Sequence, residues 1–114
     1  MTNMKPVINY GDFEKLDIRA GKVVAASAPE WSEKLIRYEV DLGEELGKRV
    51  LFSGIRRWYA PEEMLGKMLP VVVNLEPKKM GDEVSQGMVI MTDGEDGPKL
   101  IFLDEMTVPG TVIR

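Results

Sequence analysis

The chain has 114 residues, enough for its own hydrophobic core, and residues 1–114 are expected to form a single domain. It contains no histidine and no cysteine, which removes the commonest general base, the commonest metal ligand and any disulfide, so we expect a non-enzymatic protein without cofactor or metal. The net charge of −4 argues against a nucleic-acid partner. The charges are unevenly distributed, however: residues 1–79 carry 13 Lys and Arg against 12 Asp and Glu, whereas residues 80–114 carry 2 against 7. A basic face can therefore coexist with an acidic one.

The first half of the chain predicts a short helical turn and three strands. Asp12 is the expected N-cap of the turn, because a short acidic side chain accepts hydrogen bonds from the free N–H groups there. Apolar and polar residues then alternate through a long first strand with a glycine bend at Gly21. They alternate again in a second strand, where the even-numbered residues from Ile36 to Leu42 form an apolar face. The expected elements are the helical turn at 12–16, strands at 17–28, 34–42 and 48–52, and a tight turn at 43–47.

The second half predicts one small helix and two principal strands. Pro61 suits the first turn of a helix, Glu62 and Glu63 favour its positive N-terminal end, and Gly66 stops it. The other expected elements are a fourth strand at 67–75, a fifth strand at 87–92, a tight turn at 93–98, a short returning strand at 99–103 and an extended end after a turn at 108–110.

Five principal strands, short connections and one small helix between the third and fourth strands predict an all-β fold: a five-stranded OB-fold Greek-key barrel with short terminal extensions. Another small β-barrel or a sandwich is the alternative. The longest apolar runs, about five or six residues, fall far short of the ~20 needed to span a bilayer. The first residues also lack the apolar stretch of a signal peptide, so we expect a cytoplasmic protein with no membrane partner.

Polar and basic side chains gather between the fourth and fifth strands, in residues 74–88. Loops on a rigid sheet are where binding residues tend to lie, and none of these side chains is a good nucleophile or general base near neutral pH. The segment therefore favours holding an anion over reacting with it. The candidate site residues are Asn74, Lys78, Lys79, Ser85, Gln86 and Met88, joined by Lys34 at the start of the second strand.

Each of these features also has an interpretation without a ligand. The lysines suit phosphate, yet any one of them can be a solvated surface charge. Residues 85–88 offer groups for phosphate, sugar or base edges, or else a turn in which Gly87 takes a positive φ and Met88 enters the core. Trp31 and Trp58 can stack on bases, but packing in the core or at a dimer interface is the favoured interpretation.

Seven motifs occur in order along the chain: Leu16-Asp-Ile-Arg-Ala-Gly-Lys-Val23, Ser32-Glu-Lys-Leu35, Val40-Asp-Leu-Gly-Glu44, Ser53-Gly-Ile55, Pro61-Glu-Glu-Met-Leu-Gly-Lys67, Asn74-Leu-Glu-Pro-Lys-Lys-Met80 and Ser85-Gln-Gly-Met88. With these motifs the chain resembles the tRNA-binding OB-fold domain found at the C-terminus of bacterial methionyl-tRNA synthetases and in free-standing homodimeric tRNA-binding proteins. The resemblance covers nearly the whole chain, residues 12–114.

The resemblance implies a non-catalytic OB barrel that binds tRNA by shape and backbone, forms a homodimer, and assists or belongs to methionyl-tRNA synthetase. Carried over to this sequence, it places the tRNA contacts on Lys34, Asn74, Lys79, Ser85, Gln86 and Met88, with Lys78 as a local addition. The candidate residues for the dimer interface are Tyr10, Phe13 and 108–113.

The chain departs from the family pattern after Met80. Gly81, Asp82 and Glu83 follow here, where family members often have Arg-Gly, and each lost phosphate contact is expected to weaken RNA binding. A related branch of the family comprises small homodimeric export chaperones, so a peptide-binding chaperone that uses the same barrel is the main alternative function. A structural dimerisation module of a synthetase, without affinity for RNA, is the third.

Overall fold

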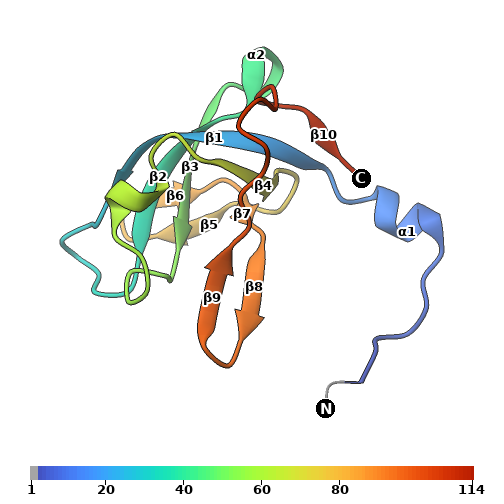
Figure 1. Cartoon of the computed structure of the whole chain (residues 1–114), viewed down its shortest axis with the longest axis horizontal. Helices are drawn as coiled ribbons and strands as arrows, with labels where there is room; N and C mark the ends of the chain where they lie inside the picture. Colours follow the sequence, from blue (N-terminus) through green and yellow to red (C-terminus); the bar gives the residue numbers. More distant parts are fainter. Residues whose placement is uncertain (1–2) are drawn as a thin grey trace.

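Strand β1 (Ile18–Ser27) is the central element of the computed structural model, which describes residues 3–114 (Figure 1). Its second half pairs antiparallel with β2 (Ile36–Asp41), and its first half pairs antiparallel with β4 (Met68–Val72). The short last strand β10 (Val112–Ile113) pairs with the start of β1. One long strand therefore belongs to both halves of the barrel wall, so a single sheet curls around a common core.

The main sheet has the strand order β3-β2-β1-β4-β7, and every pairing in it is antiparallel. These five strands form a nearly closed, OB-type barrel, which confirms the predicted fold class. A small helix lies between β3 and β4, as predicted. The remaining elements are α1 (Tyr10–Glu14), α2 (Gly43–Leu46), β3 (Lys48–Ser53), the 3-10 helix η1 (Pro61–Met64), β5 (Lys78–Met80), β6 (Glu83–Ser85), β7 (Met88–Val89), β8 (Met91–Gly94) and β9 (Gly97–Leu100).

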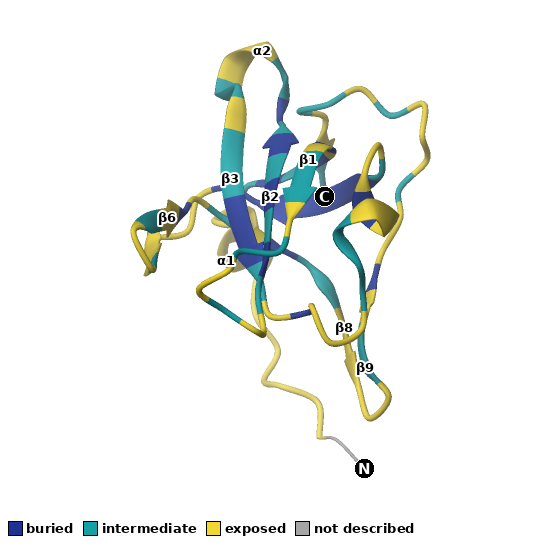
Figure 2. Ribbon diagram, turned by 90° about the vertical axis from the view of Figure 1, so that its left-hand side faces the viewer, coloured by how far each residue is buried: buried dark blue, intermediate teal, exposed yellow. Residues whose placement is uncertain are grey.

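The core is built from the inward faces of the barrel strands. Ile36, Tyr38 and Val40 alternate inward along β2 and are fully buried, as the alternation predicted. All five residues of β4 are buried, which is typical of a strand covered on both faces. Figure 2 shows the buried residues of β2 and β3 side by side in the body of the molecule, whereas the N-terminal segment and the tips of the hairpins are exposed.

One local prediction in the first half of the chain was wrong. The N-cap of α1 is Asn9, whose side-chain oxygen accepts a hydrogen bond from the backbone N–H of Asp12 at 2.9 Å, so Asp12 lies inside the helix rather than capping it. Strand β1 has a register shift between Val23 and Ala25, and the bend at Gly21 stays a prediction. The expected turn at 43–47 contains the short helix α2.

The fifth strand is interrupted rather than continuous over 87–92. Ile90 separates β7 from β8 and donates its N–H to the carbonyl of Pro70 at 3.0 Å, after which β8 pairs with β9 in a separate hairpin. Figure 1 shows this hairpin projecting from the barrel. The fourth strand ends at Val72, although the N–H of Val73 still donates to the carbonyl of Asp17 at 2.9 Å, in line with the pairing of β4 with β1. No helix within residues 3–114 is long and apolar enough to cross a membrane.

Tyr38 makes the stability of this core dependent on pH. Its ring is fully buried and its hydroxyl is hydrogen-bonded to the hydroxyl of Ser53. Burial raises the pKa of Tyr38 from 10.0 to about 12, while the hydrogen bond to Ser53 opposes the rise. The folded state therefore holds the phenol proton more tightly than the unfolded state does. This contribution to stability is complete below about pH 10 and is lost as the pH rises through about 12.

Tyr38→Phe removes this titration. We expect the free energy of unfolding of wild type to fall more steeply between about pH 9 and about pH 12, by about 2 kcal/mol in total, than that of the variant. At neutral pH the variant is expected to lose about 1 kcal/mol with the hydroxyl hydrogen bond. Urea denaturation across the pH range measures both. Tyr10→Phe, at an exposed ring, is the control, and parallel profiles for wild type and Tyr38→Phe would contradict the assignment.

Candidate functional site

The barrel closes along a seam, defined here as the contact of β3 with residues 85–87. The hydroxyl of Ser85 accepts a hydrogen bond from the backbone N–H of Phe52 at 3.1 Å and donates to the carbonyl of Gly87 at 3.3 Å. The N–H of Gln86 donates to the carbonyl of Val50 at 2.9 Å, and the Gln86 side-chain oxygen accepts from the Val50 N–H at 3.4 Å. Two predicted ligand residues thus hold the barrel shut.

Ser85 is buried, with 5% of its surface exposed, whereas Gln86 stays exposed. Because the Ser85 hydroxyl uses both its donor and an acceptor within the protein, the structure gives it a role in the seam. Gln86 keeps its amide NH2 group free of protein partners among residues 3–114. The predicted contact of each residue with tRNA stays a prediction.

Asn74 ties the loop after β4 to the segment before β1. Its side-chain oxygen accepts from the backbone N–H of Asp17 at 2.9 Å, and its side-chain NH2 group donates to the carbonyl of Lys15 at 2.7 Å. Both ends of the amide are therefore engaged with the chain. The Asn74 side chain thus connects the loop after β4 with the segment before β1. A contact with a ligand must use the hydrogen-bonding capacity that remains on the Asn74 amide.

The hairpin β5–β6 carries the two predicted lysines on opposite faces. Lys78 lies opposite Ser85 and Lys79 opposite Val84, and directly opposed residues of an antiparallel pair share a face. The face with Lys78 is turned to the barrel, since Ser85 contacts β3. The face with Lys79 and the half-exposed Val84 is turned to solvent.

Lys78 and Met88 come together at a cavity of about 230 Å³ beside the seam. Met88 is 49% exposed, so it stays outside the core and offers an apolar surface next to the lysine. The cavity is lined by Phe52, Leu75, Glu76, Lys78, Met80, Ser85, Gly87 and Met88. A cation beside a soft apolar side chain suits a ligand that carries phosphate next to a sugar or a base.

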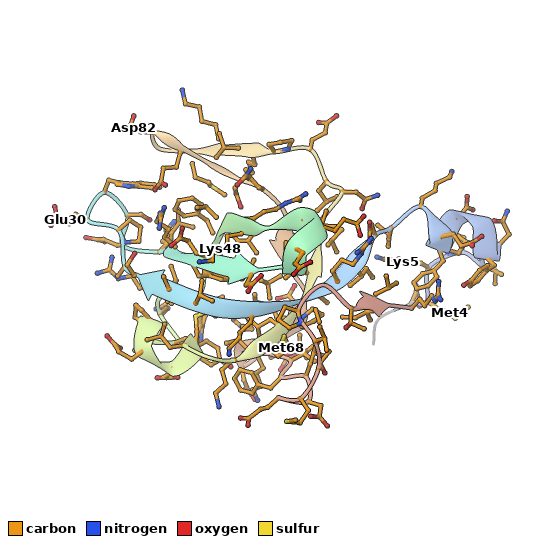
Figure 3. The ribbon with its side chains drawn as sticks, turned by 90° about the horizontal axis from the view of Figure 1, so that it is seen from above. Met4, Lys5, Glu30, Lys48, Met68 and Asp82 are labelled. Atoms are coloured by element: carbon orange, nitrogen blue, oxygen red, sulfur yellow. The ribbon has the colours of Figure 1, made fainter. Side chains whose placement is uncertain are left out.

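The loop after β1 brings Lys34 to the same side of the molecule as the tip of the hairpin. Figure 3 shows Glu30 of this loop and Asp82 of the hairpin tip projecting from one side, opposite Met4. Between them, Trp31 packs on Phe52 with ring centroids 5.8 Å apart and lies against Gly81. This contact matches the favoured interpretation of Trp31 as a packing residue.

The three lysines are free to attract anions. Among residues 3–114, no ion pair involves Lys34, Lys78 or Lys79, and all three are exposed. The two acids that replace the family's Arg-Gly are not equivalent. Glu83 is bound by Arg37, with Nε 2.9 Å from Oε2, and this hydrogen bond lowers the pKa of the Glu83 carboxyl. Asp82 is left exposed at the tip.

Two arginines of this region were missed by the sequence analysis. Arg37 neutralises Glu83, and the guanidinium of Arg49 donates to the carbonyls of Val73 at 2.7 Å and Gln86 at 3.3 Å. The inward position of Arg49 on β3 follows from its register with buried Val40, which the sequence does not show. Arg37 had no signal either, because it lies on the outer face of β2, where a charged residue is the default.

A shallow apolar groove of about 530 Å³ continues from the Lys78 cavity, with which it shares Phe52 and Met88. Trp58 and Met91 line its far part, and Trp58 is half-exposed. Among the residues that the structure describes, no cluster of Asp and Glu has the arrangement of a metal site. The Lys78 cavity and the groove thus place a cation next to apolar side chains.

The family model described as "Putative tRNA binding domain" matches residues 18–112. Curated relatives include the methionine--tRNA ligases of Xanthomonas campestris pv. campestris strain 8004, 48% identical over 99 residues, and of Dichelobacter nodosus, 46% identical over 109 residues. The matches cover 86% and 96% of this chain but 14% and 16% of the relatives. The chain thus spans a small part of the length of these relatives.

Solved structures share the whole fold. The MetRS related protein from Pyrococcus horikoshii superposes with a TM-score of 0.90 at 34% identity, covering 96% of this chain and 100% of that chain. The chaperone CsaA from Bacillus anthracis str. Ames superposes with a TM-score of 0.83 at 30% identity, again covering 96% and 100%. A MetRS related protein and a chaperone therefore share this barrel.

Ser85→Ala tests the structural role of the seam. The variant leaves the buried N–H of Phe52 without its acceptor, and we expect the free energy of unfolding to fall by about 1–3 kcal/mol. Lys79→Ala, at an exposed side chain on the solvent face of the hairpin, is expected to change it by less than about 0.5 kcal/mol. Urea denaturation of both variants beside wild type measures the difference. Equal stability of Ser85→Ala and wild type would show that the hydroxyl is dispensable to the seam.

Proposed function

This chain belongs to the tRNA-binding domain family, and from that premise we propose that it binds tRNA without catalysing a reaction. The proposal rests above all on the three exposed lysines at 34, 78 and 79, which have no carboxylate partner among residues 3–114. A backbone of phosphates is attracted by local positive charge even where the net charge is negative. Lysines attract phosphates whatever the base, which favours recognition by shape and backbone.

An RNA strand that crosses the hairpin β5–β6 meets both of its lysines. Lys79 contacts it from the solvent face, and Lys78 contacts it from the cavity beside Met88. Gln86 has a free amide NH2 group at the rim of the same surface. In this arrangement the lysines supply attraction, Gln86 supplies a hydrogen-bond donor and Met88 supplies an apolar contact.

The partner proposed beside tRNA is a methionyl-tRNA synthetase. The curated relatives are methionine--tRNA ligases, and this chain matches 14–16% of their length. A domain of this size adds tRNA affinity to a catalytic unit, either within one chain or in trans. A tRNA ligand and a synthetase partner both favour the cytoplasm as its location.

A homodimer is proposed because apolar side chains are exposed around α1 and the chain ends. Ile8 and Tyr10 are 61% and 62% exposed, and Val112 of β10 is half-exposed. Figure 1 shows α1 and the residues before it extending away from the barrel, near the C-terminus. A second copy is the occupant that would cover both at once, and paired barrels would double the RNA footprint.

A peptide-binding chaperone is the second candidate function. The groove between Trp58 and Met88 favours it, because an apolar trough of about 530 Å³ suits side chains of an extended peptide. The chaperone CsaA has the same barrel. We place this function second, because an apolar peptide would not use the unpaired lysines.

Filter retention of bulk tRNA at ~50 and ~200 mM salt tests the RNA proposal. Wild type is expected to bind at low salt and to lose affinity steeply across this range, because each phosphate contact adds about 0.9 to the slope of log K against log salt. Lys78→Ala and Lys79→Ala are each expected to reduce that slope by about 0.9. Lys99→Ala, on the β8–β9 hairpin and paired with Asp96, is the matched loss of charge and should retain the wild-type slope. No retention at ~50 mM salt would overturn the proposal.

Sedimentation equilibrium tests the homodimer. Wild type is expected to show twice the 12.8 kDa mass of one chain, and Tyr10→Asp to shift toward the monomer, because a carboxylate cannot be buried unpaired in an apolar interface. Leu65→Asp introduces the same charge at a half-exposed leucine after η1, away from α1, and should leave the mass unchanged. A monomeric wild type would exclude the dimer.

A further inference from the structure

A second cavity, of about 280 Å³, adjoins the Lys78 cavity, because Leu75 lines both. Its lining residues are Arg49, Val73, Leu75, Pro77 and Gln86, so within the described chain its only charged lining residue is a cation. The apolar groove, the Lys78 cavity and two further cavities each have at least one carboxylate among their lining residues. An anion therefore meets less repulsion in this second cavity than in any of those four.

Arg49 is held in a fixed orientation at the mouth of this cavity. Its Nη1 donates to the carbonyl of Val73, directly after β4, and to the carbonyl of Gln86, across the seam from β3. Across residues 3–114, Nε and Nη2 have no hydrogen-bond partner, and no carboxylate lies within 4.0 Å of the guanidinium. A guanidinium that is anchored along one edge presents its other donors as a pre-oriented fork, which matches phosphate oxygens.

Gln86 adds a second kind of donor to the same cavity. Its side-chain oxygen is taken by the N–H of Val50, which turns the role of the amide toward donation through its NH2 group. Arg49 is half-buried and its charge is unpaired in the described residues, an arrangement that is costly unless an anion or water compensates it. A fixed positive fork and a free amide donor form the outline of an oxyanion site.

We propose that Arg49 and Gln86 form a subsite for one phosphate group of the RNA backbone, next to the phosphate that Lys78 attracts. This subsite rests on the proposed tRNA binding. It adds Arg49, at the rim of the barrel, to the residues that contact the RNA. Arg49 then has two functions: its Nη1 fixes the seam, and its Nε and Nη2 bind the phosphate. Binding would then depend partly on whether a backbone phosphate of the RNA fits the fixed position of the Arg49 guanidinium. Flexible surface lysines do not impose such a requirement.

Substitutions of Leu75 test the subsite without removing a hydrogen bond of the seam. Leu75 is 42% exposed, makes no side-chain hydrogen bond and separates Lys78 from Arg49. Both Leu75 variants are made in the Lys78→Ala background, because Leu75 lines the Lys78 cavity as well as the Arg49 cavity. In this background Leu75→Glu places a carboxylate beside Arg49 without a lysine next to it, whereas Leu75→Gln places an uncharged side chain of the same size there. In filter retention of bulk tRNA, we expect Leu75→Glu to bind about tenfold more weakly than Leu75→Gln at ~100 mM salt and to have a slope smaller by about 0.7 to 0.9, the loss of one phosphate contact.

Arg49→Lys separates charge from geometry. The lysine keeps the positive charge but lacks the fork, so we expect a salt slope close to that of wild type with weaker affinity at every salt concentration. Thermal melting of each variant shows whether the seam is intact. Lys99→Ala remains the control for loss of a distant charge.

The outcomes distinguish the subsite from the function on which it rests. Steep salt-dependent binding by wild type, with equal slopes for Leu75→Glu and Leu75→Gln, would overturn the Arg49 subsite and leave the tRNA function standing. Absence of tRNA binding by wild type at ~50 mM salt would overturn both. A reduced slope in Leu75→Glu with unchanged melting, together with the retained slope of Arg49→Lys, would establish the subsite.

Discussion

Closure of the barrel between β3 and residues 85–87 is the constraint on which the rest of the structure depends. The main sheet leaves β3 and β7 at its two edges, and an open edge presents unpaired N–H and C=O groups. The side chain of Ser85 and both the backbone and side chain of Gln86 satisfy these groups on β3. The closure fixes where the hairpin β5–β6 leaves the barrel, and it therefore places Lys78 beside Met88.

Local charge, and not the net charge of −4, governs the candidate site. One of the two acids in the hairpin loop, Glu83, is neutralised by Arg37 and also anchors the hairpin to β2. The lowered pKa keeps the Glu83 carboxyl ionised to more acidic pH than an ordinary glutamate. Lys78 and Lys79 of the same hairpin have no ion pair among the described residues. Glu83 and Arg37 thus hold the hairpin in place, and the lysines are left to attract a ligand.

The two candidate functions use adjoining parts of one surface. The apolar groove at Trp58 and Met91 meets the Lys78 cavity at Phe52 and Met88. A nucleic acid engages both parts, because it carries phosphates and flat apolar bases, whereas an apolar peptide engages the groove alone. The unpaired charge of Arg49 has a use in the first case and none in the second, which is a physical reason to rank RNA above peptide.

The sequence by itself determined the OB barrel, the alternating faces of β2 and the collection of lysines and polar residues in 74–88, because these follow from local periodicity and residue chemistry. It could not show that Ser85, Gln86 and Asn74 are engaged with β3 and with residues 15–17, since a polar side chain in a loop has the same local signature whether it faces a ligand or the protein. The tertiary structure alone decided that Arg49 points into a cavity and that Lys78 and Lys79 lie on opposite faces. Hydrogen bonds and strand registers between distant segments set these positions, and no window of neighbouring residues contains them.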